Sequence, residues 1–144
     1  MMSHSAISTP LMAVITVEPP WYWSRIIPPI TASTSNECQF CTFSHCDLVD
    51  IADIVAEPLV AIEQPEALVP RERIAIEYTR AVMADSNAIP EPLSRQLHEH
   101  FSDPEVVELT FLIGYINMLN LFNNSLGVRY HGEYSVLKVP VEHA

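Results

Sequence analysis

A long apolar segment over residues 106–122 constrains the fold of this chain more than any other feature. The Ser102–Glu105 segment before it has the pattern of a capping box, in which Ser102 and Glu105 satisfy each other's backbone amides. Gly127 follows the segment, and a glycine there can end a helix in the left-handed conformation. The sequence therefore predicts a long helix over about residues 103–125.

This predicted helix has no continuous polar face, and such a helix needs cover all round. A single domain of 144 residues is too small to wrap it fully with one core. We therefore expect a homo-oligomer. Glu108, Asn117 and Asn120 favour a buried helix over a membrane-spanning one, so no membrane is expected as a partner.

Shorter helices are predicted before the long one. Apolar and cysteine residues recur with helical spacing from about Cys38 to Ala56. Pro70 suits the first turn of a helix running to about Ala84, and residues 91–100 make a short helix after a turn. The pattern predicts an all-α fold.

A folded domain is expected over residues 33–128. Residues 1–32 are predicted to be an irregular Pro-rich arm, because proline disrupts a helix interior; the prolines are Pro10, Pro19, Pro20, Pro28 and Pro29. Residues 129–144 are expected to form a C-terminal tail, with a strand around residues 134–139.

The charge balance excludes some partner classes. The chain has 7 Lys or Arg against 18 Asp or Glu, a net charge of -11, which repels nucleic acid and anionic lipid surfaces. The first twenty residues carry no Lys or Arg, and their apolar run is short, so no secretory signal is predicted. We expect a cytoplasmic protein.

All three cysteines and one histidine lie within nine residues: Cys38, Cys41, His45 and Cys46. A structural zinc site usually draws ligand pairs from separate elements, and four ligands on two helical turns surround an ion poorly. Haem attachment needs a histidine directly after the second cysteine, where Thr42 stands. No bound metal or cofactor is expected.

Two interpretations of the cluster remain. A Cys-x-x-Cys pair at a helix start lies where the helix dipole favours a thiolate, and His45, one turn after Cys41, can exchange a proton with that sulfur. Lowering a thiol pKa from about 8.5 to about 6.5 corresponds to roughly 2.7 kcal/mol. The alternative is a buried reduced pair with a core histidine.

Residues 36–45, Asn-Glu-Cys-Gln-Phe-Cys-Thr-Phe-Ser-His, resemble the Asn-x-Cys-x-x-Cys-x-x-x-His signature of the carboxymuconolactone decarboxylase and AhpD-like alkylhydroperoxidase superfamily. Residues 101–110 and 117–128 resemble its closing helix. The resemblance covers about residues 31–128. It implies an AhpD-like all-helical fold that assembles into trimers or hexamers.

The resemblance also implies a peroxidase cycle. Cys41 would attack the peroxide as a thiolate and become a sulfenic acid, and Cys38 would resolve it to a disulfide. His45 matches the relay histidine. A lipoyl-bearing or thioredoxin-like dithiol would restore the pair.

The sequence departs from the family pattern upstream. Cysteine-bearing members carry a relay Glu twelve residues before the first cysteine, where this chain has Ile26, and neither Arg25 nor Glu18 stands at that spacing. The N-terminal part is therefore interpreted as diverged or shortened. A non-catalytic oligomeric relative that has lost the relay is the alternative function; a decarboxylase of the namesake type is a third, disfavoured by the retained cysteines.

Other polar residues receive structural interpretations. Cys46 is expected in the core, Glu37 as a solvated charge, and His98 and His100 as surface residues without a metal. Four asparagines of the long helix are expected to tie backbone or neighbouring chains together: Asn117, Asn120, Asn123 and Asn124.

Overall fold

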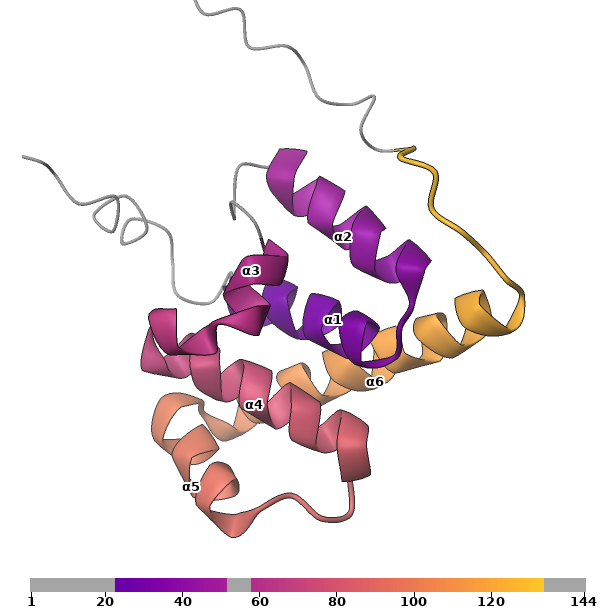
Figure 1. The fold of residues 1–144 in the computed structure, drawn as a ribbon. Helices are drawn as coiled ribbons and strands as arrows, with labels where there is room; N and C mark the ends of the chain where they lie inside the picture. The colour runs from indigo at the N-terminus through magenta and orange to yellow at the C-terminus, as the bar shows by residue number, and fades with distance from the viewer. Residues whose placement is uncertain (1–22, 52–57, 134–144) are drawn as a thin grey trace, which may run out of the picture.

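The computed structural model describes residues 23–51 and 58–133. That part of the chain contains six α-helices and one short 3-10 turn, and no strand (Figure 1). This confirms the predicted all-α fold. The elements are α1 (Trp23–Ser35), α2 (Gln39–Ile51), α3 (Pro58–Glu63), η2 (Pro65–Ala67), α4 (Pro70–Asp85), α5 (Glu91–His100) and α6 (Asp103–Ser125).

Helix α1 corrects the prediction that residues 1–32 are irregular throughout. Residues 23–35 are helical and include Pro28 and Pro29. The helix is central in the described structure, where it packs against α2, α4 and α6 (Figure 1). The segment with the least helix-like sequence is therefore the one around which the other helices gather.

Tertiary packing explains why α1 tolerates its prolines. An interior proline costs a helix about 3 kcal/mol, because it removes a hydrogen bond and its ring crowds the preceding turn. Ile27 and Ile30 are fully buried, and burial of each stabilises the fold by roughly 1.5–3 kcal/mol. The buried hydroxyls of Thr31 and Ser33 donate to carbonyl oxygens one turn back, both at 2.8 Å. Burial and satisfied polar groups thus outweigh local propensity.

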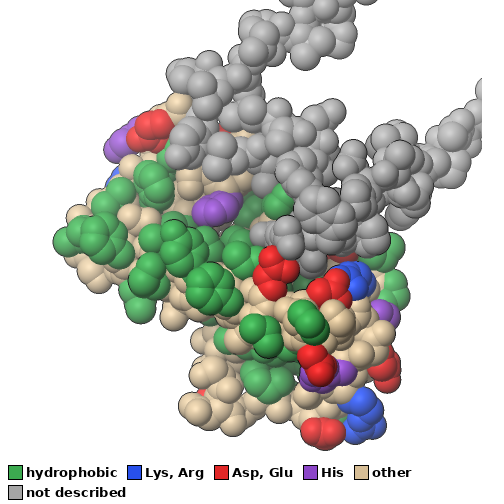
Figure 2. Space-filling view, turned by 180° about the vertical axis from the view of Figure 1, so that it is seen from behind, with side chains coloured by type: hydrophobic (Ala, Val, Ile, Leu, Met, Phe, Trp, Pro, Cys, Tyr) green, Lys and Arg blue, Asp and Glu red, His purple; other side chains and the backbone are tan. Residues whose placement is uncertain are grey.

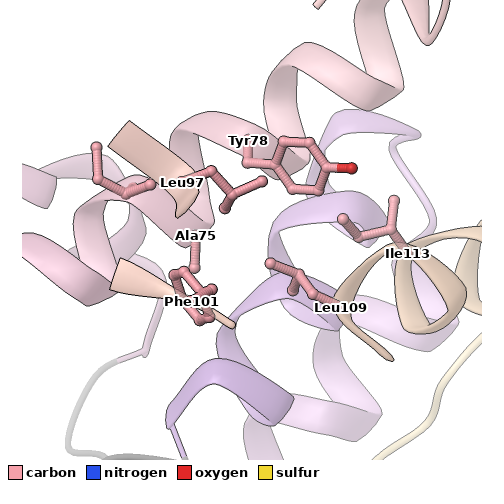
Figure 3. Close-up of a cluster of buried hydrophobic side chains, with 7 residues drawn as sticks. Ala75, Tyr78, Leu97, Phe101, Leu109 and Ile113 are labelled. Carbon is pink, nitrogen blue, oxygen red and sulfur yellow. The ribbon is translucent and has the colours of Figure 1, made fainter. Parts of the chain in front are cut away.

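Two groups of buried apolar side chains hold the helices together. One joins α4, α5 and α6 through seven residues (Figure 3): Ile74, Ala75, Tyr78, Leu97, Phe101, Leu109 and Ile113. The other joins α1, α3 and α4 through Ile27, Ile30, Ile62 and Ile76. Helix α4 belongs to both groups, so it connects α5 and α6 to α1 and α3.

Helix α6 begins and ends as predicted. The Ser102 N–H donates to a Glu105 carboxylate oxygen at 2.8 Å, and the Ser102 hydroxyl donates to the same oxygen at 2.9 Å. Gly127 has a φ of 65°. The Val128 N–H donates to the Asn123 carbonyl oxygen at 2.9 Å, as in a Schellman motif.

One long face of α6 is apolar and uncovered. We call it the α6 stripe; it consists of Val107, Phe111, Tyr115, Met118, Leu121, Phe122 and Leu126, all exposed. Phe111 is 69% exposed and its ring stacks on Tyr115. Figure 2 shows hydrophobic side chains gathered in a band across the face opposite the view of Figure 1. By length and composition alone, α6 also passes the test for a membrane-crossing helix.

The remaining helix predictions agree with the structure over the described residues. Helices α4 and α5 have nearly the predicted bounds, and α2 covers residues 39–51 of the helix predicted to reach Ala56. Residues 52–57 lie outside the described residues. So do the strand predicted at 134–139 and most of both termini.

Candidate functional site

The cysteine pair is positioned by the turn between α1 and α2. Cys38 directly precedes α2, and its carbonyl oxygen accepts the N–H of Thr42 at 2.9 Å, the first hydrogen bond of the helix. Glu37 has a φ of 52°, a left-handed conformation that non-glycine residues rarely adopt. That conformation reverses the chain so that α2 starts beside the end of α1. The Glu37 side chain is exposed, as the solvated-charge interpretation requires.

Both thiols are reduced and almost completely buried. Cys38 is 1% exposed and Cys41 is 3% exposed. Cys41 lies in the first turn of α2, one turn after Cys38, and the two side chains are near enough for Cys38 to raise the pKa of the Cys41 thiol. The pair is therefore close, with no disulfide between the sulfurs.

An asparagine of α6 contacts the Cys41 sulfur directly. The side-chain amide of Asn123 donates to Cys41 Sγ at 3.2 Å. Asn120, one turn earlier on α6 and fully buried, also acts to lower the pKa of the Cys41 thiol. The interpretation of these asparagines as structural ties missed this contact. The available signal was the recurrence of asparagine along one side of an otherwise apolar helix.

The same row of asparagines holds the α1–α2 turn. Asn36 donates to the side-chain oxygens of Asn117 and Asn120, at 2.8 and 3.1 Å. The amide of Asn124 donates to the Asn36 carbonyl oxygen at 2.9 Å. Asn120 donates to the Ser33 hydroxyl at 3.1 Å. We call these five residues, Asn36, Asn117, Asn120, Asn123 and Asn124, the asparagine cluster. The predicted tie to backbone is confirmed for Asn124, whereas the bonds of Asn117 and Asn120 join side chains.

Burial dominates the ionisation of Cys41. Removal from water raises the pKa of the Cys41 thiol, and its hydrogen bond and charge interaction with Cys38 raise the pKa further. The hydrogen bonds from Asn123 and Asn120 act in the opposite direction. The sequence-based expectation of a lowered thiol pKa is therefore not met at Cys41, because the helix terminus and the amides do not compensate for desolvation.

His45 lies one turn after Cys41 and is half-buried. Its Nδ1 atom is 2.7 Å from the Cys41 carbonyl oxygen. Since a carbonyl oxygen only accepts, Nδ1 carries the proton in this contact and Nε2 is the nitrogen free to accept one from elsewhere. The structure thus brings His45 to the backbone of Cys41 rather than into a direct contact with its sulfur.

Ile26, which stands where the family resemblance expects a relay Glu, has apolar neighbours. Ile26 is on α1, partly buried, and packs against the group formed by Ile27, Ile30, Ile62 and Ile76. A carboxylate there would lose its hydration among apolar side chains. Ile26 therefore contributes to the core and cannot carry a proton.

The other candidate residues lie away from this pair. Cys46 packs at the edge of the α1, α3 and α4 group, and burial, aided by the nearby Asp47 charge, raises its pKa to about 11. His98 Nδ1 is 3.2 Å from an Asp103 carboxylate oxygen, and His100 contributes its carbonyl oxygen to Arg71. Among the described residues, no three His, Cys, Asp or Glu side chains are grouped so that they could hold a metal ion.

Comparison with known proteins places the fold in a class. A crystal structure of a protein of unknown function from Agrobacterium tumefaciens, with a suggested role as the antioxidant defence protein AhpD, matches with a TM-score of 0.67 and 25% identity. The match covers 83% of this chain and 82% of that one. The chain therefore has an AhpD-like helical fold, with a buried thiol pair at the start of α2.

A curated relative is also similar in sequence. The uncharacterized protein YnjA of Escherichia coli K12 is 29% identical over 106 residues, which is 66% of this chain and 54% of YnjA. The similar region thus spans about half the length of YnjA. No family model matches the chain.

Proposed function

We propose that this protein is a thiol-dependent peroxidase that reduces hydroperoxides with Cys38 and Cys41. The observation that carries the proposal is the buried, reduced pair at the start of α2, with an amide of α6 donating to the Cys41 sulfur at 3.2 Å. The AhpD-like fold supports the general class, since the similar crystal structure has a suggested antioxidant role.

The proposed cycle balances in three steps. The Cys41 thiolate attacks the terminal peroxide oxygen, the O–O bond breaks, and the product alcohol takes a proton, leaving Cys41 as a sulfenic acid. The Cys38 thiol then attacks the Cys41 sulfur, forming a disulfide and releasing water. An external dithiol, lipoyl-bearing or thioredoxin-like, reduces the disulfide and is itself oxidised to a disulfide.

His45 is proposed as the proton carrier. Its Nδ1 atom is held by the Cys41 carbonyl oxygen, which leaves Nε2 to accept the thiol proton through a water and return it to the alcohol. We place this cycle in the cytoplasm, where the reductant pool keeps unpaired thiols reduced, and in a homo-oligomer, either a trimer or a hexamer.

Peroxide consumption by the purified chain tests the proposal. With an organic hydroperoxide and a dithiol reductant, we expect turnover by the wild type and loss of turnover in Cys41→Ser. Cys38→Ser should still form one sulfenic acid per chain, detectable by dimedone labelling, but no intramolecular disulfide. Cys46→Ser serves as the matched control and should keep the wild-type rate. Equal turnover in wild type and Cys41→Ser would falsify the proposal.

A non-catalytic relative is the second candidate. Ile26 in the core in place of an acid, and a Cys41 thiol whose pKa is raised by burial, both favour it. For that candidate we expect neither sulfenic acid nor disulfide after exposure to modest peroxide concentrations. The same labelling experiment therefore separates the two candidates.

A further inference from the structure

We propose that Asn123 is a catalytic residue that stabilises the Cys41 thiolate by donating a hydrogen bond to its sulfur, so that an uncharged amide helps to activate the thiol where Ile26 supplies no carboxylate. The inference rests on the proposed function only in naming Cys41 as the attacking thiol. The amide contact itself belongs to the structure, whatever substrate the thiol meets.

The Asn123 side chain contacts the Cys41 sulfur directly. The Nδ2 atom of Asn123 lies 3.2 Å from Cys41 Sγ, and sulfur accepts hydrogen bonds at this distance. The bond joins residues 82 positions apart in the chain, so it depends on the packing of α6 over the start of α2. A donor to sulfur favours the anion over the neutral thiol.

Other polar side chains also lie near the Cys41 sulfur. Among the described residues, the side chains that shift the Cys41 pKa are Asn123, Asn120 and Cys38, none of them positively charged, and Asn123 donates a hydrogen bond to the sulfur. His45 directs Nδ1 at the Cys41 carbonyl oxygen, and the exposed Glu37 side chain is negative. Since Ile26 supplies no carboxylate, the described residues offer amide dipoles as the direct stabilising contacts of a thiolate.

Asn123 differs from the neighbouring asparagines of α6 in the partner of its side-chain amide. The Asn117 side-chain oxygen accepts a hydrogen bond from the Asn36 amide, and the Asn124 amide donates to the Asn36 carbonyl oxygen. The Asn120 amide donates to the Ser33 hydroxyl, and its side-chain oxygen accepts from the Asn36 amide. Those bonds hold the turn. Asn123 is half-buried at the edge of the cluster, and its side-chain amide is directed at the sulfur.

The alkylation rate of Cys41 tests this inference without peroxide. Iodoacetamide labelling, resolved by cysteine with mass spectrometry, reports the thiolate fraction at each pH. We expect Asn123→Ala to lower the Cys41 rate about tenfold at a fixed pH below the thiol pKa, the effect of losing one hydrogen bond to a charged group. Asn123→Asp should lower it further, because a carboxylate cannot donate and repels a thiolate.

Two controls make the result decisive. Asn124→Ala removes a neighbouring amide that donates to the Asn36 backbone, and it should lower the Cys41 rate clearly less than Asn123→Ala does if the effect comes from the sulfur contact. Circular dichroism and thermal unfolding of each variant check that the fold persists. If Asn123→Asp unfolds, Asn123→Ser, which keeps a small donor, replaces it and should recover part of the wild-type rate.

Opposite outcomes overturn the inference. An unchanged or increased Cys41 rate in Asn123→Ala would mean that the amide oxygen accepts from the neutral thiol instead. Equal losses in Asn123→Ala and Asn124→Ala would assign the effect to the turn. A wild type without peroxide turnover, but with the expected labelling differences, contradicts the proposed function and leaves the role of Asn123 standing.

Discussion

At the scale of single residues, the chemistry of Cys41 is a balance between burial and hydrogen bonding. A sulfur that is 3% exposed has lost nearly all its water, which disfavours the anion. The side-chain amides of Asn123 and Asn120 stabilise the thiolate in part, and the dipole at the start of α2 also favours it. Desolvation is the larger effect, so the thiol pKa is raised overall.

This balance predicts an alkaline pH profile. The thiolate is the reacting form, and a raised pKa means that its fraction still grows above pH 9.0, the ordinary thiol value. We therefore expect the alkylation rate of Cys41 to rise through pH 9.0 without levelling off. The Cys46 thiol has a pKa of about 11, so the alkylation rate of Cys46 should also keep rising up to about that pH. Site-resolved labelling from pH 6 to 11 measures both alkylation rates. A plateau in the Cys41 rate near neutral pH would contradict a Cys41 pKa raised by burial.

At the scale of elements, α6 performs several tasks along its length. Its start is anchored to α4, where Arg71 donates to Glu105 at 2.6 Å and lies over the Phe101 ring, 4.1 Å from the centroid. Its middle packs into the core through Leu109 and Ile113. Its end carries the asparagines that hold the α1–α2 turn. The site is therefore sensitive to the placement of α6 as a whole.

The anchored start of α6 predicts a dependence of stability on acid. The Ser102 N–H and the Arg71 guanidinium hold the pKa of Glu105 at about 2, well below its usual 4.5. A lowered folded-state pKa contributes stability above pH 4.5 that is lost as pH falls towards 2. Because Glu105 is 40% exposed, solvent screening limits the contribution to about 1 kcal/mol.

Thermal unfolding between pH 2 and 7 measures this effect. Glu105→Gln should have a lower midpoint than wild type at pH 7, and the difference should shrink as the pH approaches 2. Glu91→Gln is the control, since Glu91 pairs with Arg95 at 3.8 Å on an exposed surface. A Glu105→Gln midpoint that runs parallel to wild type over the whole range would argue against the anchor.

At the scale of the whole molecule, the α6 stripe remains apolar and exposed in one copy of the chain. Its seven large side chains are all exposed, and Figure 2 shows hydrophobic side chains gathered into a band on the face opposite the view of Figure 1. Patches of this size mark contact surfaces. The opposite face of α6 carries the asparagines that contact the α1–α2 turn, so we expect the stripe to contact other copies of the chain rather than lipid.

Solution size tests this assignment. Size-exclusion chromatography with light scattering should give an oligomer for the wild type. Phe111→Glu combined with Met118→Glu should shift it towards monomer, because each apolar side chain contributes about 1.5–3 kcal/mol when buried. Val69→Glu changes an equally exposed residue outside α6 and should keep the wild-type size. A monomeric wild type, or one that floats with liposomes, would refute the contact between copies.

The sequence by itself determined the elements that local chemistry specifies. Helices α4, α5 and α6 have clear start and stop signals, such as the Ser102–Glu105 cap and Gly127, and their bounds were predictable from neighbouring residues. The placement of Cys38 and Cys41 at a helix start followed in the same way. These features depend on interactions within a few residues of one another.

Only the tertiary structure decided the role of α1 and the surroundings of the thiols. The prolines of α1 predict an irregular segment, and packing against four other helices reverses that local preference. Asn123 reaches Cys41 across 82 positions of sequence, and burial of the pair raises the Cys41 pKa that the helix start alone would lower. Desolvation and long-range hydrogen bonds depend on which helices meet, and a local sequence pattern does not encode that.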